Sequence, residues 1–236
     1  MWSGPRNIST ALMRSFGNRP DCHVTDEPLY AYYLEQTGLD HPGRAETLAG
    51  HDRDWQTVVH WLTGEVPGNR AVWYLKLMAH HMLPTVQRDW IFCLVNCFLI
   101  RPPREMLTSL LEFLPQPRVE DTGLPQQWEL FERVRQQTGR VPPVIDGNDV
   151  LKDPQGVLGE LCGQTGIPFL PEMLVWPPGR RDTDGAWADH WYAKVYRTTR
   201  FAPWKPKTGP LPAPVQPLLR ECQDYYERLA EHRICI

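Results

Sequence analysis

The sequence predicts an α/β protein with a central parallel sheet, and two observations carry that prediction. Short apolar runs alternate along the chain with segments of helical periodicity, the order that parallel strands and crossover helices produce. The 236 residues, 42% hydrophobic and 22% charged, are enough to bury a sizeable core. We therefore expect a three-layer sandwich that forms one domain over residues 1–236.

The strands and helices are expected in the following order along the chain. The four apolar runs that read as strands are Cys22–Thr25, Ala71–Met78, Ile91–Ile100 and Val141–Ile145. The helices are expected to begin near Thr10, Trp55, Pro103, Gln126, Pro154 and Val215. Residues 174–212 mix Pro, Arg, Asp and Trp, which predicts a long loop with one helix around Ala186–Tyr196. Loops of that length often act as lids or binding loops.

Charge and composition exclude several functional classes. The net charge of −3 offers no general attraction for nucleic acid or for an anionic membrane, so neither is expected as a partner. No run of 18 or more apolar residues occurs, and residues 1–20 lack the features of a signal peptide, which predicts a cytoplasmic protein. The six cysteines form no C-x-x-C pair, so neither a metal site nor a disulfide framework is expected.

The first motif, Ser3 to Ser15, leads through a Gly-Pro turn into the helix start Ala-Leu-Met. Ser9 and Thr10 stand at that start, where free N–H groups and the helix dipole favour an anion, and Arg6 would add a fixed cation. An ordinary helix cap with a surface arginine is the alternative. The segment lacks the second glycine and the lysine of the nucleoside-triphosphate loop, which disfavours an ATP or GTP hydrolase.

The second motif places Arg101 at the end of an apolar strand and Ser109 on the proline-started helix that follows. Ligands of open α/β sheets bind at the carboxyl ends of the strands, so Arg6 and Arg101 could together grip two phosphates. The alternative is that Arg101 pairs with a carboxylate at the helix end, such as Glu105.

Together these segments resemble the sulfotransferase family, which uses 3′-phosphoadenosine-5′-phosphosulfate (PAPS) as sulfuryl donor and has a fold like that of P-loop NTPases. The family's 5′-phosphate loop, Pro-[Lys/Arg]-Ser-Gly-[Ser/Thr]-[Ser/Thr], falls on Pro5, Arg6, Asn7, Ile8, Ser9 and Thr10. Arg101 and Ser109 match its 3′-phosphate residues, and residues 144–168 resemble a later strand, Asp-Pro turn and helix. The resemblance implies a nucleotide-binding core over 3–168, followed by a loop, an embedded helix and a C-terminal helix over 169–236.

Two departures from the family pattern carry their own expectations. Ile8 stands where the family has glycine, and a β-branched residue resists positive φ, so we expect the loop not to copy a glycine conformation there. Asn7 would take the left-handed turn instead. Only two residues precede Ser3, too few for a usual strand, so the first strand is either a stub or the reading frame begins upstream.

The resemblance also implies catalytic residues. Glu27 matches the Glu-Pro of carboxylate-using members and would be the general base, although a helix-start carboxylate is the alternative. Lys76 resembles the strand lysine that neutralises the donor, since a lysine in an apolar run demands a partner or a ligand. His80 or His81 is the other candidate base. Arg180 and Arg181 would close over the nucleotide.

The expected function is sulfuryl transfer from PAPS to a hydroxyl or amine of a small-molecule acceptor. The nucleotide left after PAPS gives up its sulfuryl group is 3′,5′-diphosphoadenosine, and no metal is expected to be required. Two alternatives stay open: a non-catalytic module that binds the same nucleotide, and a small-molecule kinase, for which the lysine of the nucleoside-triphosphate loop is missing.

Overall fold

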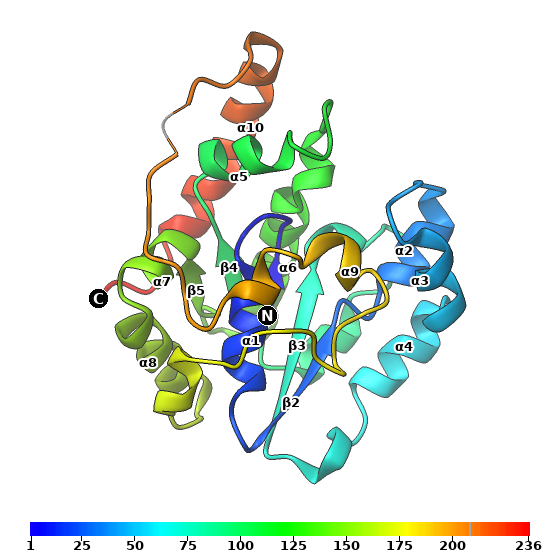
Figure 1. Ribbon diagram of the computed structural model, residues 1–236, viewed down its shortest axis with the longest axis vertical. Coiled ribbons are helices and arrows are strands. Elements are labelled where there is room, and N and C mark those ends of the chain that lie inside the picture. Colours follow the sequence, from blue (N-terminus) through cyan, green and yellow to red (C-terminus); the bar gives the residue numbers. More distant parts are fainter. Residues whose placement is uncertain (208) are drawn as a thin grey trace.

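A five-stranded parallel sheet forms the centre of the protein, as the computed structural model of residues 1–207 and 209–236 shows (Figure 1). Its strand order is β2-β3-β1-β4-β5, and all four pairings are parallel. The strands are β1 (Trp2–Ser3), β2 (Cys22–Asp26), β3 (Val72–Met78), β4 (Phe98–Ile100) and β5 (Val144–Asp146). The α/β class and the parallel sheet predicted from the sequence are confirmed.

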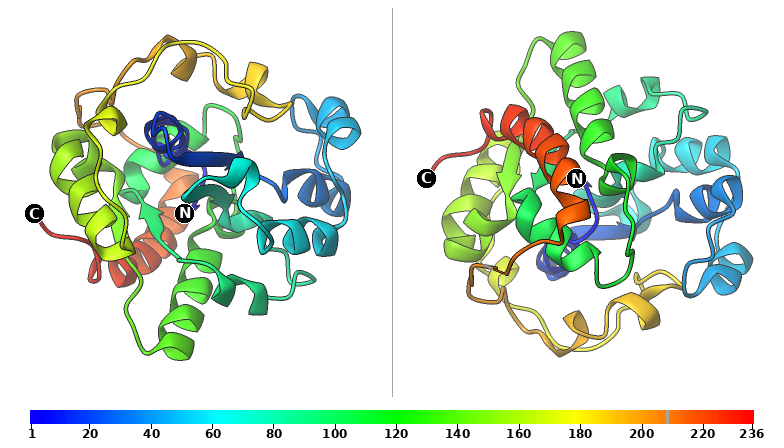
Figure 2. Two further views of the ribbon diagram at one scale, coloured as in Figure 1. Left: turned by 90° about the horizontal axis from the view of Figure 1, so that it is seen from below. Right: turned by 90° about the horizontal axis from the view of Figure 1, so that it is seen from above.

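Helices cover both faces of this sheet, and each face has its own apolar core. The helices are α1 (Ser9–Gly17), α2 (Tyr30–Thr37), α3 (Arg44–Gly50), α4 (Trp55–Leu62), α5 (Pro103–Leu110), α6 (Leu124–Thr138), α7 (Gly147–Lys152), α8 (Pro154–Thr165), α9 (Ala188–Trp191) and α10 (Gln216–Ala230). One core joins α4, α5, α6 and α10 to the sheet, and the other joins α1, α7 and α8. Figure 2 shows α1 and α6 on opposite faces. The three expected layers are therefore present.

Two strands are shorter than their apolar runs predicted. Residues Asp89–Cys93 form a 3₁₀ turn instead of the first half of a strand, and the Asn96 side chain donates to Ile91 O at 2.8 Å, which holds the turn. An apolar run can be buried as a packed turn as well as a strand, so periodicity alone could not separate the two. β5 begins at Val144 because the prolines before it have no N–H to donate to a ladder.

The helix starts follow their capping residues closely. Asp54 caps α4, and the carboxylate of Asp153 accepts from Gly156 N at 2.9 Å at the start of α8. α2 and α3 lie in a stretch for which no helix was expected. Of the helix expected around Ala186–Tyr196, only the four residues of α9 are α-helical; residue 208 of the same loop lies outside the described residues. None of the described helices is long and apolar enough to cross a bilayer.

Candidate nucleotide and catalytic site

The candidate residues come together at the carboxyl edge of the sheet because the strands are parallel. β1 leads into the loop before α1, β2 ends at Asp26, and β4 ends just before Arg101. β1 is in the centre of the strand order, with β2 and β3 on one side and β4 and β5 on the other, and open α/β sheets bind ligands where the strand order reverses in this way. The two motifs read from the sequence therefore meet at one place.

The loop before α1 adopts the left-handed conformation at two non-glycine residues. Ile8 has φ 60° and ψ 15°, and Arg6 has φ 63°, whereas Asn7 is not among the residues with positive φ. The expectation that Ile8 would avoid a glycine conformation, with Asn7 taking the left-handed turn, is therefore wrong. Ile8 packs against the core beneath α1 and its carbonyl accepts from Ala11 N at 2.9 Å, which offsets a cost of roughly 1–2 kcal/mol for the left-handed backbone.

This loop leaves a row of backbone donors without partners. Within the described residues, the N–H groups of residues 6–10 donate to no protein acceptor, and the hydroxyls of Ser9 and Thr10 make no hydrogen bond. Free N–H groups at the start of a nine-residue helix, combined with left-handed turns, form an anion-binding concavity. The loop has the donors that a phosphate requires.

Arg6, Arg101 and Ser109 form one cluster beside this loop. Arg6 Nε donates to Ser109 Oγ at 2.8 Å, and an amino group of Arg101 donates to Arg6 O at 3.0 Å. Arg101 also forms an ion pair with Glu105 at 2.9 Å, the partner considered for it as a structural alternative. It makes this ion pair while it also contacts Arg6. Burial, reinforced by Arg101, lowers the pKa of Arg6, while Glu112 opposes the shift.

Lys207 joins these arginines, although the sequence did not single it out. Its pKa is lowered by burial and by the positive charges of Arg101 and Arg6, with Glu112 acting in the opposite direction. The only signal was the basic pair Lys205-Pro-Lys207 in a proline-rich stretch. We call Arg6, Arg101 and Lys207 the cationic cluster. The positive charges of these three residues repel one another, and a bound anion would offset that repulsion.

Arg180 and Arg181 make their described contacts within their own loop. Arg180 pairs with Asp189 at 2.7 Å, and Arg181 donates to Pro177 O at 2.5 Å. In the described part of the chain no hydrogen bond or ion pair joins either arginine to the cationic cluster.

Lys76 is buried in β3 beside two carboxylates. Its ammonium donates to Asp26 at 2.9 Å and also contacts Glu27, which follows β2 with φ 39°. Burial opposes the charged lysine, but the two carboxylates outweigh it and raise the pKa of Lys76 well above its usual value. Burial raises the pKa of Glu27, and Lys76 offsets part of that rise. One lysine thus faces two carboxylates.

Tyr192 completes this group from a distant part of the chain. Its hydroxyl donates to Asp26 at 2.9 Å and accepts from Lys76 at 2.6 Å. Gly185 N, in the same loop, donates to Asp26 at 3.2 Å. The buried ion pair of Arg14 with Asp184, at 2.5 Å, fastens the loop to α1. Figure 1 shows the segment between α8 and α10 running over α1. Nothing in the local sequence around Tyr192 indicated this position.

His80 and His81 follow β3, the strand that carries Lys76, and lie in an aromatic cluster. The His81 ring stacks on Tyr30 at 4.9 Å and on Tyr33 at 4.7 Å, and neither of its nitrogens has a partner in the described residues. Burial lowers the pKa of His80 to about 3 and that of His81 well below its usual value. Rings with pKa values this low are weak proton acceptors near neutral pH.

The fold and this edge of the sheet define a protein of the sulfotransferase class. A family model described as "Sulfotransferase domain" matches residues 1–232, and the chain belongs to that family. Solved sulfotransferase domains share the fold. The domain from the curacin biosynthetic pathway is 16% identical, with 97% of this chain and 95% of that chain covered and a TM-score of 0.56. The domain from the Synechococcus PCC 7002 olefin synthase is 17% identical, with 96% and 92% covered and a TM-score of 0.54.

Curated relatives come from Arabidopsis thaliana and are longer. Branched-chain-amino-acid aminotransferase-like protein 2 is 34% identical over 233 residues, which is 98% of this chain and 41% of that protein. Branched-chain-amino-acid aminotransferase-like protein 1 is 36% identical over 213 residues, 89% of this chain and 38% of that protein. The chain thus spans about two fifths of the length of these relatives.

Proposed function

We propose that this chain transfers a sulfuryl group from PAPS to a hydroxyl or amine of a small-molecule acceptor. The observation that carries the proposal is the convergence, at one edge of the sheet, of unpartnered backbone donors with the cationic cluster. A nucleotide with phosphates at two separate positions matches this arrangement, since each phosphate would meet its own donors.

Two groups of residues would hold the donor nucleotide. The N–H groups of residues 6–10, with the hydroxyls of Ser9 and Thr10, suit the 5′-phosphate end. Arg101, Ser109 and Lys207 suit the 3′-phosphate. AMP has no 3′-phosphate, so its binding would not depend on the side chains that hold that group. The difference in affinity between 3′,5′-diphosphoadenosine and AMP therefore measures their contribution.

Glu27 and Lys76 would serve the chemical step. PAPS supplies a sulfuryl group whose bond to the 5′-phosphate breaks as a bond to the acceptor forms. The Glu27 carboxylate takes the acceptor's proton, and its raised pKa makes it a better base than an exposed glutamate. The ammonium of Lys76 stabilises negative charge at the leaving phosphate. Asp26 and Tyr192 fix the direction in which that ammonium points.

Calorimetric titration with 3′,5′-diphosphoadenosine, AMP and ATP with Mg²⁺ tests the nucleotide part of the proposal. We expect 3′,5′-diphosphoadenosine to bind most tightly and, at 100 times its dissociation constant, to add about 2.7 kcal/mol to the stability of the folded chain. Tighter binding of ATP with Mg²⁺ would favour the kinase alternative. No binding of 3′,5′-diphosphoadenosine at millimolar concentration to the folded chain would refute the proposal.

A pair of lysine variants tests the position of the 3′-phosphate. Lys207→Ala should weaken 3′,5′-diphosphoadenosine while leaving AMP nearly unchanged. Lys205→Ala is the matched control, because Lys205 lies two residues away and is exposed. Equal losses in both variants would show that the effect comes from general charge and not from the cationic cluster.

A further inference from the structure

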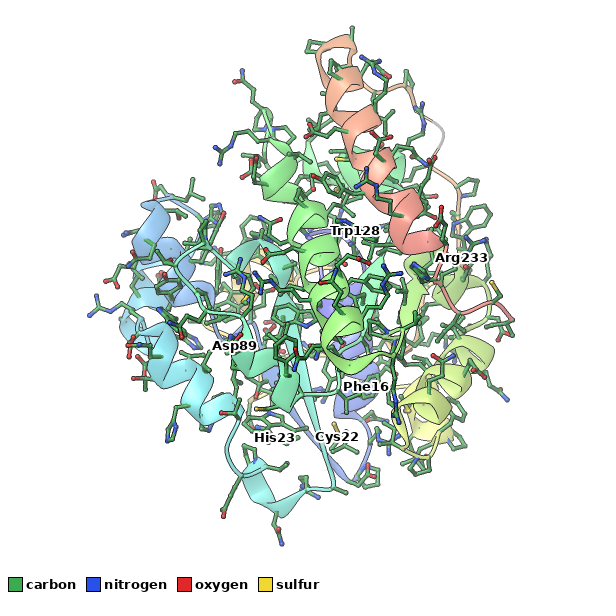
Figure 3. All side chains as sticks on the ribbon, turned by 180° about the vertical axis from the view of Figure 1, so that it is seen from behind. Phe16, Cys22, His23, Asp89, Trp128 and Arg233 are labelled. Carbon is green, nitrogen blue, oxygen red and sulfur yellow. The ribbon has the colours of Figure 1, made fainter. Side chains whose placement is uncertain are left out.

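The outer edge of the sheet carries main-chain groups that no neighbouring strand satisfies. In the described residues β2 stands first in the strand order and pairs with β3 alone. Glu27 N donates to Lys76 O at 3.0 Å, so the odd-numbered residues of this segment bond towards β3. Because the direction alternates along a strand, Val24 and Asp26 turn their N–H and C=O groups outwards. Figure 3 labels His23 near the start of this strand.

These outward groups belong to buried residues. Val24 is 4% exposed and Asp26 is 5% exposed. Within the described part of the chain, no protein group forms a hydrogen bond with the outward N–H or C=O of either residue. Buried main-chain groups are nearly always paired, and an open strand edge is a template for another strand. The edge of β2 therefore has the bonding capacity that an added strand would use.

A groove of about 420 Å³ runs along this edge. β2 lines it from His23 to Asp26. Val58 and Trp61 of α4 form one wall, and Asp182 to Gly185, in the loop before α9, form the other. The two walls lie on opposite faces of the sheet, because α4 packs in one apolar core and this loop follows the other. Four strand residues span about 13 Å, so the groove suits an extended segment of about four residues.

The groove is negatively charged. The described residues that line it include four aspartates and neither lysine nor arginine. Two of the aspartates pair with Arg14 and Lys76, which lie outside the lining. Asp52 and Asp182 are exposed and form no ion pair within the described residues. Burial lowers the pKa values of the two histidines in the lining, so they add no positive charge near pH 7.

This charge decides between the possible occupants. Pairing of two β2 edges from two copies of the chain would bring the unpaired carboxylates of both copies together, and like charges across strands are destabilising. A segment with basic side chains would offset the charge instead. Side chains alternate between the two sides of a strand. One side of an added strand would face Val58 and Trp61 and the other would face Asp182, so apolar and basic residues should alternate in it.

We propose that the edge of β2 binds an extended segment of a partner protein, about four residues long, in which apolar and basic residues alternate. The segment adds to the sheet as a further strand. Its main chain bonds to Val24 and Asp26, and its basic side chains reach Asp52 and Asp182. Its apolar side chains cover Trp61, which is 46% exposed.

A short peptide probes this edge directly. Acetyl-Lys-Val-Lys-Val-Lys-amide should bind in calorimetry and should slow hydrogen exchange at the amides of Val24 and Asp26. Acetyl-Glu-Val-Glu-Val-Glu-amide is the control for charge. Asp182→Asn should weaken the lysine peptide about two- to fivefold, as the loss of one exposed ion pair does. Asp224→Asn is the matched control, because it removes an exposed carboxylate from α10, outside the groove.

Three results would overturn this inference: unchanged exchange at Val24 and Asp26 with the lysine peptide at millimolar concentration, equal binding of the glutamate peptide, or equal weakening by the two variants. Spermidine that binds as tightly as the peptide would assign the groove to a small cation and reject the added strand. A dimer that protects the same amides without peptide would assign the edge to a second copy. None of these measurements involves a nucleotide, so they are independent of the proposed function.

Discussion

Acid should destabilise this protein through His81, which is buried as a neutral ring. The side chain is 1% exposed and stacked on two tyrosines, and burial lowers its pKa well below the usual value. The folded pKa is depressed, so the unfolded chain binds the proton first. The stability that the neutral ring contributes is therefore present above about pH 6.5 and is lost as the pH falls below it.

The size of the effect follows from the number of protons taken up on unfolding. Each histidine that stays neutral in the folded state costs about 1.4 kcal/mol per pH unit below its unfolded pKa of about 6.5. Between about pH 7.5 and pH 5.5 His81 alone should lower the free energy of unfolding by about 1.4 kcal/mol. His80, whose pKa burial lowers to about 3, should add a similar amount.

Urea denaturation of the wild type and of His81→Phe at these two pH values provides the assay. Phenylalanine keeps the stacking on Tyr30 and Tyr33 but cannot bind a proton. The free energy of unfolding should therefore fall by about 1.4 kcal/mol less in the variant than in the wild type. His60→Phe is the control, because His60 is exposed on α4. Parallel pH dependence of the wild type and His81→Phe would refute this account of the buried ring.

Three further variants probe the site and its support. Arg101→Ala should weaken 3′,5′-diphosphoadenosine by roughly 1.5–3 kcal/mol in calorimetry while AMP binding stays nearly unchanged. Glu27→Gln should reduce turnover of an identified acceptor about 10²–10⁴-fold with nucleotide affinity retained. Wild-type turnover should fall as the pH drops through the raised pKa of Glu27, because only the carboxylate can accept a proton. Arg14→Met leaves the buried Asp184 carboxylate without its partner and should cost about 3–5 kcal/mol in urea denaturation.

Each of these variants has an outcome that contradicts it, and the two arginine variants also have matched controls. The control for Arg101→Ala is Arg104→Ala, because Arg104 is exposed on the same helix as Ser109; this variant should leave the affinity for both nucleotides unchanged. Equal losses of affinity for AMP and 3′,5′-diphosphoadenosine in Arg101→Ala would show that Arg101 has a structural role. Turnover of Glu27→Gln within about threefold of the wild type would leave Glu27 a helix-start carboxylate. The control for Arg14→Met is Arg53→Met, because the ion pair of Arg53 with Glu35 is exposed. Equal losses in the free energy of unfolding would show that burial of the Arg14 ion pair does not determine its contribution.

Much of the sheet and of the candidate site at its carboxyl edge could be predicted from the sequence because both depend on local order. β2 and β3 follow continuous apolar runs, and Asp54 and Asp153 mark helix starts by their capping chemistry. Arg101 could be placed beside Arg6 because the carboxyl ends of parallel strands share an edge. These features need only short-range patterns and a rule of topology.

The remaining features depend on contacts between distant segments, which no local pattern encodes. Tyr192 meets Lys76 across 116 positions of the chain, and Lys207, in a proline-rich stretch, is close enough to Arg101 and Arg6 for their charges to lower its pKa. Ile8 takes a left-handed conformation because the core beneath it and the first turn of α1 fix it there, against its own preference. Propensity predicts the average behaviour of a residue, and packing decides the individual case.

The Tyr192 contact also constrains which parts of this chain could be exchanged for another sequence. The loop after α8 supplies Tyr192 and Gly185 to Asp26 and is anchored to α1 through Asp184. A transplanted loop without these residues would leave Lys76 with a different set of partners. Residues 184–192 should therefore be kept unchanged in any chimera, and sequence variation is best confined to the flanks of that segment.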